Sequence, residues 1–194
     1  EVRGRNHTGQ IWHFGRPGGP VVVDFQMSRG RDGPAEFLKG FRGILQSDGY
    51  SAYDKLGSGI EYAGCMAHAR RKIFNAHQLS PQDPVPRQLL DQIAAIYGIE
   101  AEARESGATA QQRLALRQER SRPLMDRLRE QLVTAGAAVL PKSVFGRACA
   151  YALGQWTRLE VFLNHGEVEA DNNWAYAARG ISPVMPTARL CRVE

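Results

Sequence analysis

Hydrophobic and polar positions divide the chain into two parts with different periodicities. In the first part, short runs rich in β-branched and aromatic residues alternate with turn signals, and this pattern predicts strands. The runs occupy residues 11–14, 21–25, 43–47 and 60–64. The first two flank a Pro- and Gly-rich turn at 16–20 and predict a hairpin. A short helix is predicted between Pro34, which suits a first helical turn, and Gly40.

The second part, from about residue 66 to 165, carries apolar residues at alternating spacings of three and four, which predicts helices. The stripes run through residues 89–100, 124–132 and 145–163. The last of these has the most regular spacing and predicts one long helix. Linker-like segments at 80–86 and 136–141 separate the helices.

The two textures together predict the α/β fold class. Strand, helix and strand in succession indicate a mixed sheet flanked by helices, with parallel neighbours joined by right-handed crossovers. The helix-rich second part then forms a large helical insertion or addition to this sheet.

Composition narrows the class of protein without fixing it. The chain has 194 residues, of which 43% are hydrophobic, enough to bury a sizeable core. A net charge of +5 permits an anionic partner such as nucleic acid. Cys65, Cys149 and Cys191 are odd in number and far apart, which favours a reducing compartment, and we expect the cytoplasm. No apolar run approaches the roughly 18–20 residues of a membrane span.

Asp48 is the most informative single residue, because it follows the apolar run 43–47 and precedes Gly49. A carboxylate at the C-terminal end of a strand lies at the rim where α/β sites assemble, and it suits a hard divalent cation. Asp-Gly pairs also form ordinary turns. The residues alone leave both interpretations open.

Residues 65–72 combine a Cys65-x-x-His68 spacing with the basic run Arg70-Arg71-Lys72. Zinc needs two further ligands, and the remaining cysteines and histidines show no second paired spacing, so a structural zinc site is not predicted. The basic run suits either phosphate contact or solvation.

Two further features have both an ordinary and a functional interpretation. Arg113, Arg117 and Arg120 recur on one helical face, as a solvated stripe or as a phosphate-binding one. In the segment Asp171-Asn172-Asn173, Asp171 is a natural helix N-cap. The alternative is an acid that the fold brings near Asp48.

Four segments in order resemble the catalytic region of insertion-sequence-66 transposases. They are residues 41–50, which contain Asp48, and residues 65–72, 117–124 and 171–174. The resemblance extends from about residue 9 to 180 and is more specific than any one segment, because all four occur in the right order.

This resemblance implies a bacterial enzyme of DNA transposition and recombination with a ribonuclease-H-like fold. It implies an Asp-Asp-Glu triad that holds two divalent ions, normally Mg²⁺, and that cuts and joins DNA at insertion-sequence ends. Asp48 matches the second Asp, as a catalytic and metal-binding residue. Arg70, Arg71 and Lys72 are then DNA-binding residues, whereas Cys65, His68, Asp171, Asn172 and Asn173 are motif residues without an assigned role.

The resemblance also implies a domain organisation. The parts are the ribonuclease-H-like core at 1–77, the helical insertion at 78–165, the start of the C-terminal catalytic helix at 166–180 and a divergent tail at 181–194.

Two departures from the family pattern concern the triad. The family's first Asp is expected upstream of Val2, and this sequence begins after that position. The segment 174–180, where the family has its Glu, contains no acid. One carboxylate cannot hold two ions, so we expect the chain as given to be impaired in strand transfer.

Three alternatives remain. The first is a non-catalytic basic module that binds DNA or another transposase subunit, and self-association into a homo-oligomer stays open with it. The second is an active nuclease that uses Asp48, Asp24 and a C-terminal acid. The third, a small-molecule enzyme, is the least favoured, because no cofactor fingerprint is present.

Overall fold

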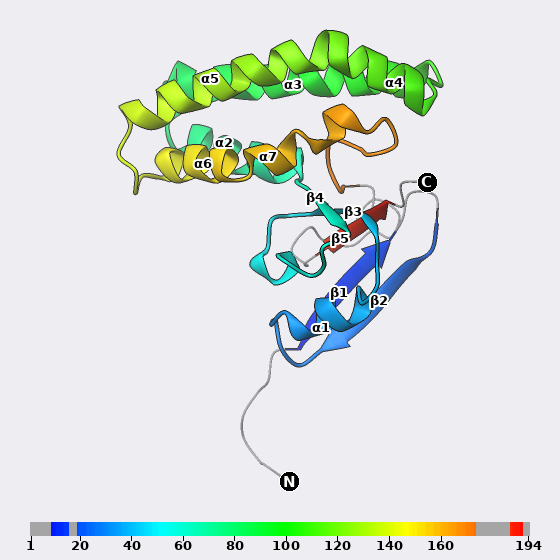
Figure 1. The fold of residues 1–194 in the computed structure, drawn as a ribbon. Helices are drawn as coiled ribbons and strands as arrows, with labels where there is room; N and C mark the ends of the chain where they lie inside the picture. The colour runs from blue at the N-terminus through cyan, green and yellow to red at the C-terminus, as the bar shows by residue number, and fades with distance from the viewer. Residues whose placement is uncertain (1–8, 16–18, 174–186, 192–194) are drawn as a thin grey trace, which may run out of the picture. The chain divides into compact units, whose positions relative to one another are not determined.

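A computed structural model describes residues 9–15, 19–173 and 187–191 of the chain, which form two compact units (Figure 1). One unit draws on residues 1–62 and 172–194, and the other is residues 63–171. The first unit contains the sheet and the second contains most of the helices. The fold class is therefore α/β, as the sequence predicted.

Five strands form one sheet in the order β2-β1-β5-β3-β4. Their bounds are β1 Gln10–Gly15, β2 Val21–Gln26, β3 Gly43–Ser47, β4 Ile60–Ala63 and β5 Thr187–Cys191. β1 and β2 form the predicted antiparallel hairpin, in which Trp12 lies opposite Asp24. The sequence did not predict β5, which lies between β1 and β3.

The sheet is mixed in its strand directions. β1 runs parallel to β5, with Phe14 opposite Ala188. β3 runs antiparallel to β5, with Leu45 opposite Leu190. The expectation of parallel neighbours is therefore correct for the first of these pairs and wrong for the second.

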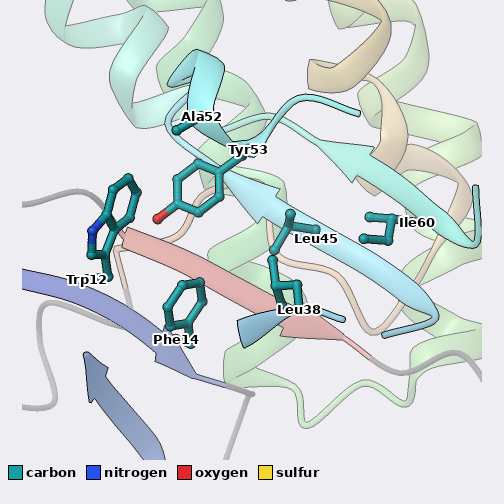
Figure 2. Close-up of a cluster of buried hydrophobic side chains, with 7 residues drawn as sticks. All are labelled: Trp12, Phe14, Leu38, Leu45, Ala52, Tyr53 and Ile60. Carbon is teal, nitrogen blue, oxygen red and sulfur yellow. The ribbon is translucent and has the colours of Figure 1, made fainter. Parts of the chain in front are cut away.

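An aromatic and aliphatic cluster packs on one face of β1 (Figure 2). Trp12 and Phe14 point to this face because they are two residues apart on a strand. The rings of Trp12 and Tyr53 meet edge to face with centroids 5.5 Å apart. Leu45 brings β3 into the same cluster, so this core fixes the strand that ends just before Asp48. The other members of the cluster come from the segment after α1 (Asp32–Phe37), from η1 (Ser51–Tyr53) and from β4; they are Leu38, Ala52 and Ile60.

The helical unit consists of helices α2 to α7 and two irregular turns. The bounds are α2 Met66–Leu79, α3 Pro84–Glu105, α4 Ala110–Leu116, the π-helical turn η2 Arg117–Ser121, α5 Arg122–Ala138, α6 Val144–Gly154, α7 Trp156–Leu159 and the 3₁₀ turn η3 Val161–Asn164. α2 packs against α3 and α6, and α5 packs against the same two helices. These four helices therefore enclose a common core.

Local sequence signals explain where these helices begin. The Asp83 carboxylate accepts a 2.9 Å hydrogen bond from the Val85 N–H, and Pro84 occupies the first turn of α3. Thr109 and Gln112 form a reciprocal capping box at α4. The predicted stripes face inward, since Leu89, Ile93 and Leu128 are buried.

The prediction of one long helix over 145–163 is wrong. Gly154 ends α6, and Gln155 leaves helical geometry with φ −97° and ψ 3°. Glycine is a poor helix former, and Gly154 stands at the break. The regular apolar spacing persists across the break because α6, α7 and η3 all bury their apolar side chains, as Cys149, Trp156 and Leu163 show.

No helix within the described residues is both long and apolar enough to cross a bilayer. The N-terminal residues 1–8, the segment 174–180 predicted to begin the catalytic helix, and residues 181–186 and 192–194 of the predicted tail lie outside the described residues.

Candidate functional site

Asp48 lies directly after β3, at the strand end where the sequence predicted it. Its Oδ1 accepts a hydrogen bond from the Tyr50 N–H at 3.0 Å, and its side chain is half-buried. Gly49 adopts a left-handed φ of 81°, which glycine tolerates without strain. The carboxylate therefore stabilises the turn after β3 while remaining partly open to solvent.

Tyr50 is held firmly beside this turn. Its hydroxyl donates to the Arg29 carbonyl at 2.8 Å, and the Arg29 guanidinium lies over its ring at 4.5 Å from the centroid. Its ring also lies 6.0 Å from that of Trp12, between centroids. The backbone that orients Asp48 is thus anchored to the core of the sheet.

A complete metal centre does not form among the described residues. No group of three or more His, Cys, Asp or Glu side chains in that part of the chain is placed to hold an ion. Mg²⁺ requires about six oxygen ligands in near-octahedral geometry, and Asp48 alone supplies one carboxylate. The donors described here do not fit a two-metal site.

A second group of motif residues meets inside the helical unit. The Met66 N–H at the start of α2 donates to the Ala170 carbonyl at 3.0 Å. The Tyr97 hydroxyl on α3 donates to Asp171 Oδ2 at 2.7 Å. The start of α2 at Met66 and the segment Ala170–Asp171 therefore lie close together, although they are far apart in the sequence.

Burial raises the pKa of Tyr97 far above its usual range, and the charge of Asp171 and the hydrogen bond to it raise it further. Cys65 acts in the same direction, whereas Arg70 opposes it. Tyr97 consequently remains a protonated donor at ordinary pH, and Asp171 is engaged as its acceptor.

The three predicted DNA-binding residues lie on the exposed surface of α2. Arg70, Arg71 and Lys72 are all accessible. The Lys72 ammonium lies 4.6 Å from the centroid of the Tyr151 ring on α6, a cation–π contact that restrains it. Of the remaining motif residues, His68 is half-buried, Asn172 buried and Asn173 exposed.

Sequence reasoning missed a buried ion cluster made by Glu100, Arg113, Arg117 and Glu169. Arg117 Nε and Nη2 bind the two oxygens of Glu100 at 2.7 and 2.6 Å. Arg113 Nη2 bridges Glu100 Oε2 and Glu169 Oε2, at 2.9 Å each. The Arg117 and Glu100 side chains are only 1% and 3% exposed.

The interpretation of Arg113 and Arg117 as a solvated or phosphate-binding stripe is therefore wrong, because both face Glu100 in the interior. Arg120 does lie on the surface, where it pairs with Glu102 at 2.7 Å. The available signal was Glu100 itself, the one acid on the apolar stripe of α3. A charge on a buried stripe implies a buried partner.

Burial acts to raise the pKa of Glu100. The hydrogen bonds and charges of Arg117 and Arg113 outweigh it and hold that pKa below its usual range. Glu100 is therefore a carboxylate near neutral pH, and the two arginines and two glutamates cancel in formal charge.

The chain matches the family described as Transposase IS66 family over residues 1–185. It belongs to this family, and the resemblance of its four motif segments is confirmed. No solved structure matches the chain.

Two similar proteins come from Sinorhizobium fredii (strain NBRC 101917 / NGR234), both described as uncharacterized. Protein y4jD is 35% identical over 166 residues, which cover 81% of this chain and 32% of y4jD. Protein y4qI is 34% identical over 187 residues, which cover 88% of this chain and 34% of y4qI. The chain thus spans about a third of the length of these relatives.

Proposed function

We propose that this chain is a segment of the catalytic region of an IS66 transposase and acts in DNA transposition. In this proposal, Asp48 is one metal-binding carboxylate of an Asp-Asp-Glu site. The observation that carries it is the position of Asp48 at the end of β3, a buried strand between two others, in a chain that belongs to this family.

The proposal extends to the domain organisation. Residues 1–77 contribute to a ribonuclease-H-like core, and 78–165 form its helical insertion. A mixed sheet whose chain leaves after β4 and returns to β5 supports this topology. The compact units divide after Tyr62, so α2 is grouped with the helices.

DNA is the proposed partner of the exposed basic residues on α2. Arg70, Arg71 and Lys72 carry three positive charges within one turn of helix, and the chain has a net charge of +5. Such side chains contact phosphates without reading sequence. They serve to position the DNA backbone.

Divalent metal is proposed as the cofactor because the family uses an acidic triad. Since Asp48 alone does not hold two ions, no cleavage step is assigned to the described residues. We expect the 194-residue chain by itself to bind DNA but not to transfer strands.

The test is fluorescence anisotropy with labelled duplex DNA over a range of salt. Replacing Arg70, Arg71 and Lys72 with Gln is expected to lower the salt slope of log K by up to about 2.7, at roughly 0.9 per phosphate contact. A matched control replaces the exposed Arg87, Arg127 and Arg129 with Gln, removing the same charge from α3 and α5. Equal losses in the two variants would contradict a binding surface on α2.

A second candidate is a non-catalytic module that binds DNA or a transposase subunit. The observation that favours it is the turn-stabilising bond from Tyr50 to Asp48. DNA affinity that is indifferent to divalent metal and to Asp48→Asn would select this function. Metal-dependent nicking of element ends, lost on Asp48→Asn, would show instead that the chain is an active enzyme.

A further inference from the structure

Arg117 and Gln118 of η2 and Arg122 of α5 donate hydrogen bonds to the loop 161–171, which follows α7. Arg117 Nη1 donates to the Phe162 carbonyl at 2.9 Å and to the His165 carbonyl at 2.6 Å. Gln118 Nε2 donates to the Leu163 carbonyl at 2.6 Å. Carbonyl groups in irregular backbone need donors, and these side chains supply them.

The π-helical turn explains why these side chains face the same loop. The Arg122 N–H bonds to the Arg117 carbonyl, five residues earlier. This wider turn lets Arg122 act beside Arg117, and its Nη2 donates to Asn164 Oδ1 at 2.8 Å. Single π-helical turns occur frequently at functional sites.

The same loop is tied down at two further points. Gly166 lies against the Ala110 carbonyl so closely that a Cβ atom would collide with it. Glu169 receives both Nη groups of Arg113, at 3.0 and 2.9 Å. The next residues are Ala170 and Asp171, which bind Met66 and Tyr97.

The cluster does not suit contact with DNA. Arg117 is fully enclosed, Arg113 is only 12% exposed, and their charges are balanced by Glu100 and Glu169. A neutral buried cluster does not attract phosphate. Arg117 instead donates to backbone carbonyls of its own chain, at Phe162 and His165.

We infer that Arg117 is a positioning residue for the family motif that begins at Asp171. Through its own bonds to the Phe162 and His165 carbonyls, and through Glu100 and Arg113, it fixes the loop 161–171. It so holds Asp171 on Tyr97, beside the proposed DNA-binding helix α2. The inference rests on the proposed function only in giving this motif a part in DNA transposition.

The test uses the 194-residue chain labelled with ¹³Cζ-tyrosine, in which Tyr97→Phe identifies one signal among six tyrosines. Arg117→Lys keeps the charge but loses the forked contact with Glu100. It is expected to shift the Tyr97 signal and to speed amide exchange in 161–171 by about tenfold or more, without affecting α6. The matched control is Arg120→Lys, in the same π-helical turn but on the surface, which is expected to change neither.

An unchanged Tyr97 signal and unchanged exchange in a folded Arg117→Lys chain would overturn the inference. Should that variant fail to fold, Arg113→Lys at the edge of the cluster carries the same prediction and the same refutation.

DNA binding separates this inference from the proposed function. Weaker DNA binding by Arg117→Lys with an unshifted Tyr97 signal would overturn the positioning role and leave the proposed function intact. A shifted Tyr97 signal in a chain that binds no DNA would contradict the proposed function and support the positioning role.

Discussion

The Tyr97 hydroxyl and the Asp171 carboxylate meet at 2.7 Å across 74 residues of sequence. This bond joins the middle of α3 to the residue at which the chain leaves the helical unit. It ties the family motif that begins at Asp171 to a helix that lies outside the four motif segments.

Tyr97→Phe removes the donor and leaves the partly buried carboxylate with one bond fewer. Hydrogen bonds to charged groups contribute about 1.5–3 kcal/mol, so a loss of that order in the free energy of unfolding is expected. Urea denaturation measures it. Asp171→Asn retains an acceptor oxygen and should lose less; the reverse order would contradict the importance of the hydroxyl donor.

Arg117→Met and Arg120→Met form a contrasting pair. The first leaves Glu100 buried with one partner fewer, a change that typically lowers the free energy of unfolding by about 3–5 kcal/mol. The second breaks an exposed pair, for which about 0–1 kcal/mol is typical. Similar losses in the two variants would show that the cluster around Glu100 is not buried as described.

Acid should weaken the fold through Glu100. Its pKa is lower in the folded chain than in the unfolded one, so its contribution is fully present above the unfolded value, about 4.3, and is lost as pH falls through the folded value. Glu100→Gln should make the free energy of unfolding depend less on pH over this acidic range. It should also lower that free energy near pH 7.

Glu102→Gln is the matched control for this pH dependence. Its carboxylate is exposed, and its pKa is lowered chiefly by the hydrogen bond from Arg120. Solvent screens such pairs, so the free energy of unfolding of Glu102→Gln should fall with acid much as it does in wild type. An identical loss of unfolding free energy with falling pH in wild type and Glu100→Gln would contradict this role of Glu100.

Two glycines should respond to alanine in opposite directions. Gly166→Ala forces a Cβ atom against the Ala110 carbonyl and is expected to lower the melting temperature and loosen the loop. Gly98→Ala places a Cβ in open space on α3 and should add about 0.5–1 kcal/mol from helix propensity. Thermal unfolding of the two variants measures both effects.

Local pattern was enough to predict the hairpin, the strand before Asp48 and the apolar faces of the long helices. The apolar-rich run that contains Trp12 and Phe14 marks a buried strand, in which the intervening His13 is buried as well. β5 escaped prediction because its pairing with β1 and β3 depends on segments far away in sequence.

The buried cluster shows the other limit of pattern. Arg113, Arg117 and Arg120 have nearly equivalent spacing, yet the first two face the interior and the third faces solvent. What distinguishes them is the position of α3, which carries Glu100. The spacing of residues within one helix gives no information about where a second helix packs. Glu100 on its apolar stripe was the single local sign of this arrangement.

A metal-binding role of Asp48 is tested most directly by the effect of Mn²⁺ on DNA affinity in wild type and in Asp48→Asn. Asparagine keeps an oxygen for the Tyr50 N–H but removes the charge that a cation requires. Asp32→Asn, at the exposed start of α1, is the control for charge alone. Mn²⁺ is expected to strengthen DNA binding by wild type and by Asp32→Asn, but not by Asp48→Asn. An equal effect of Mn²⁺ in all three chains would contradict a metal-binding role for Asp48.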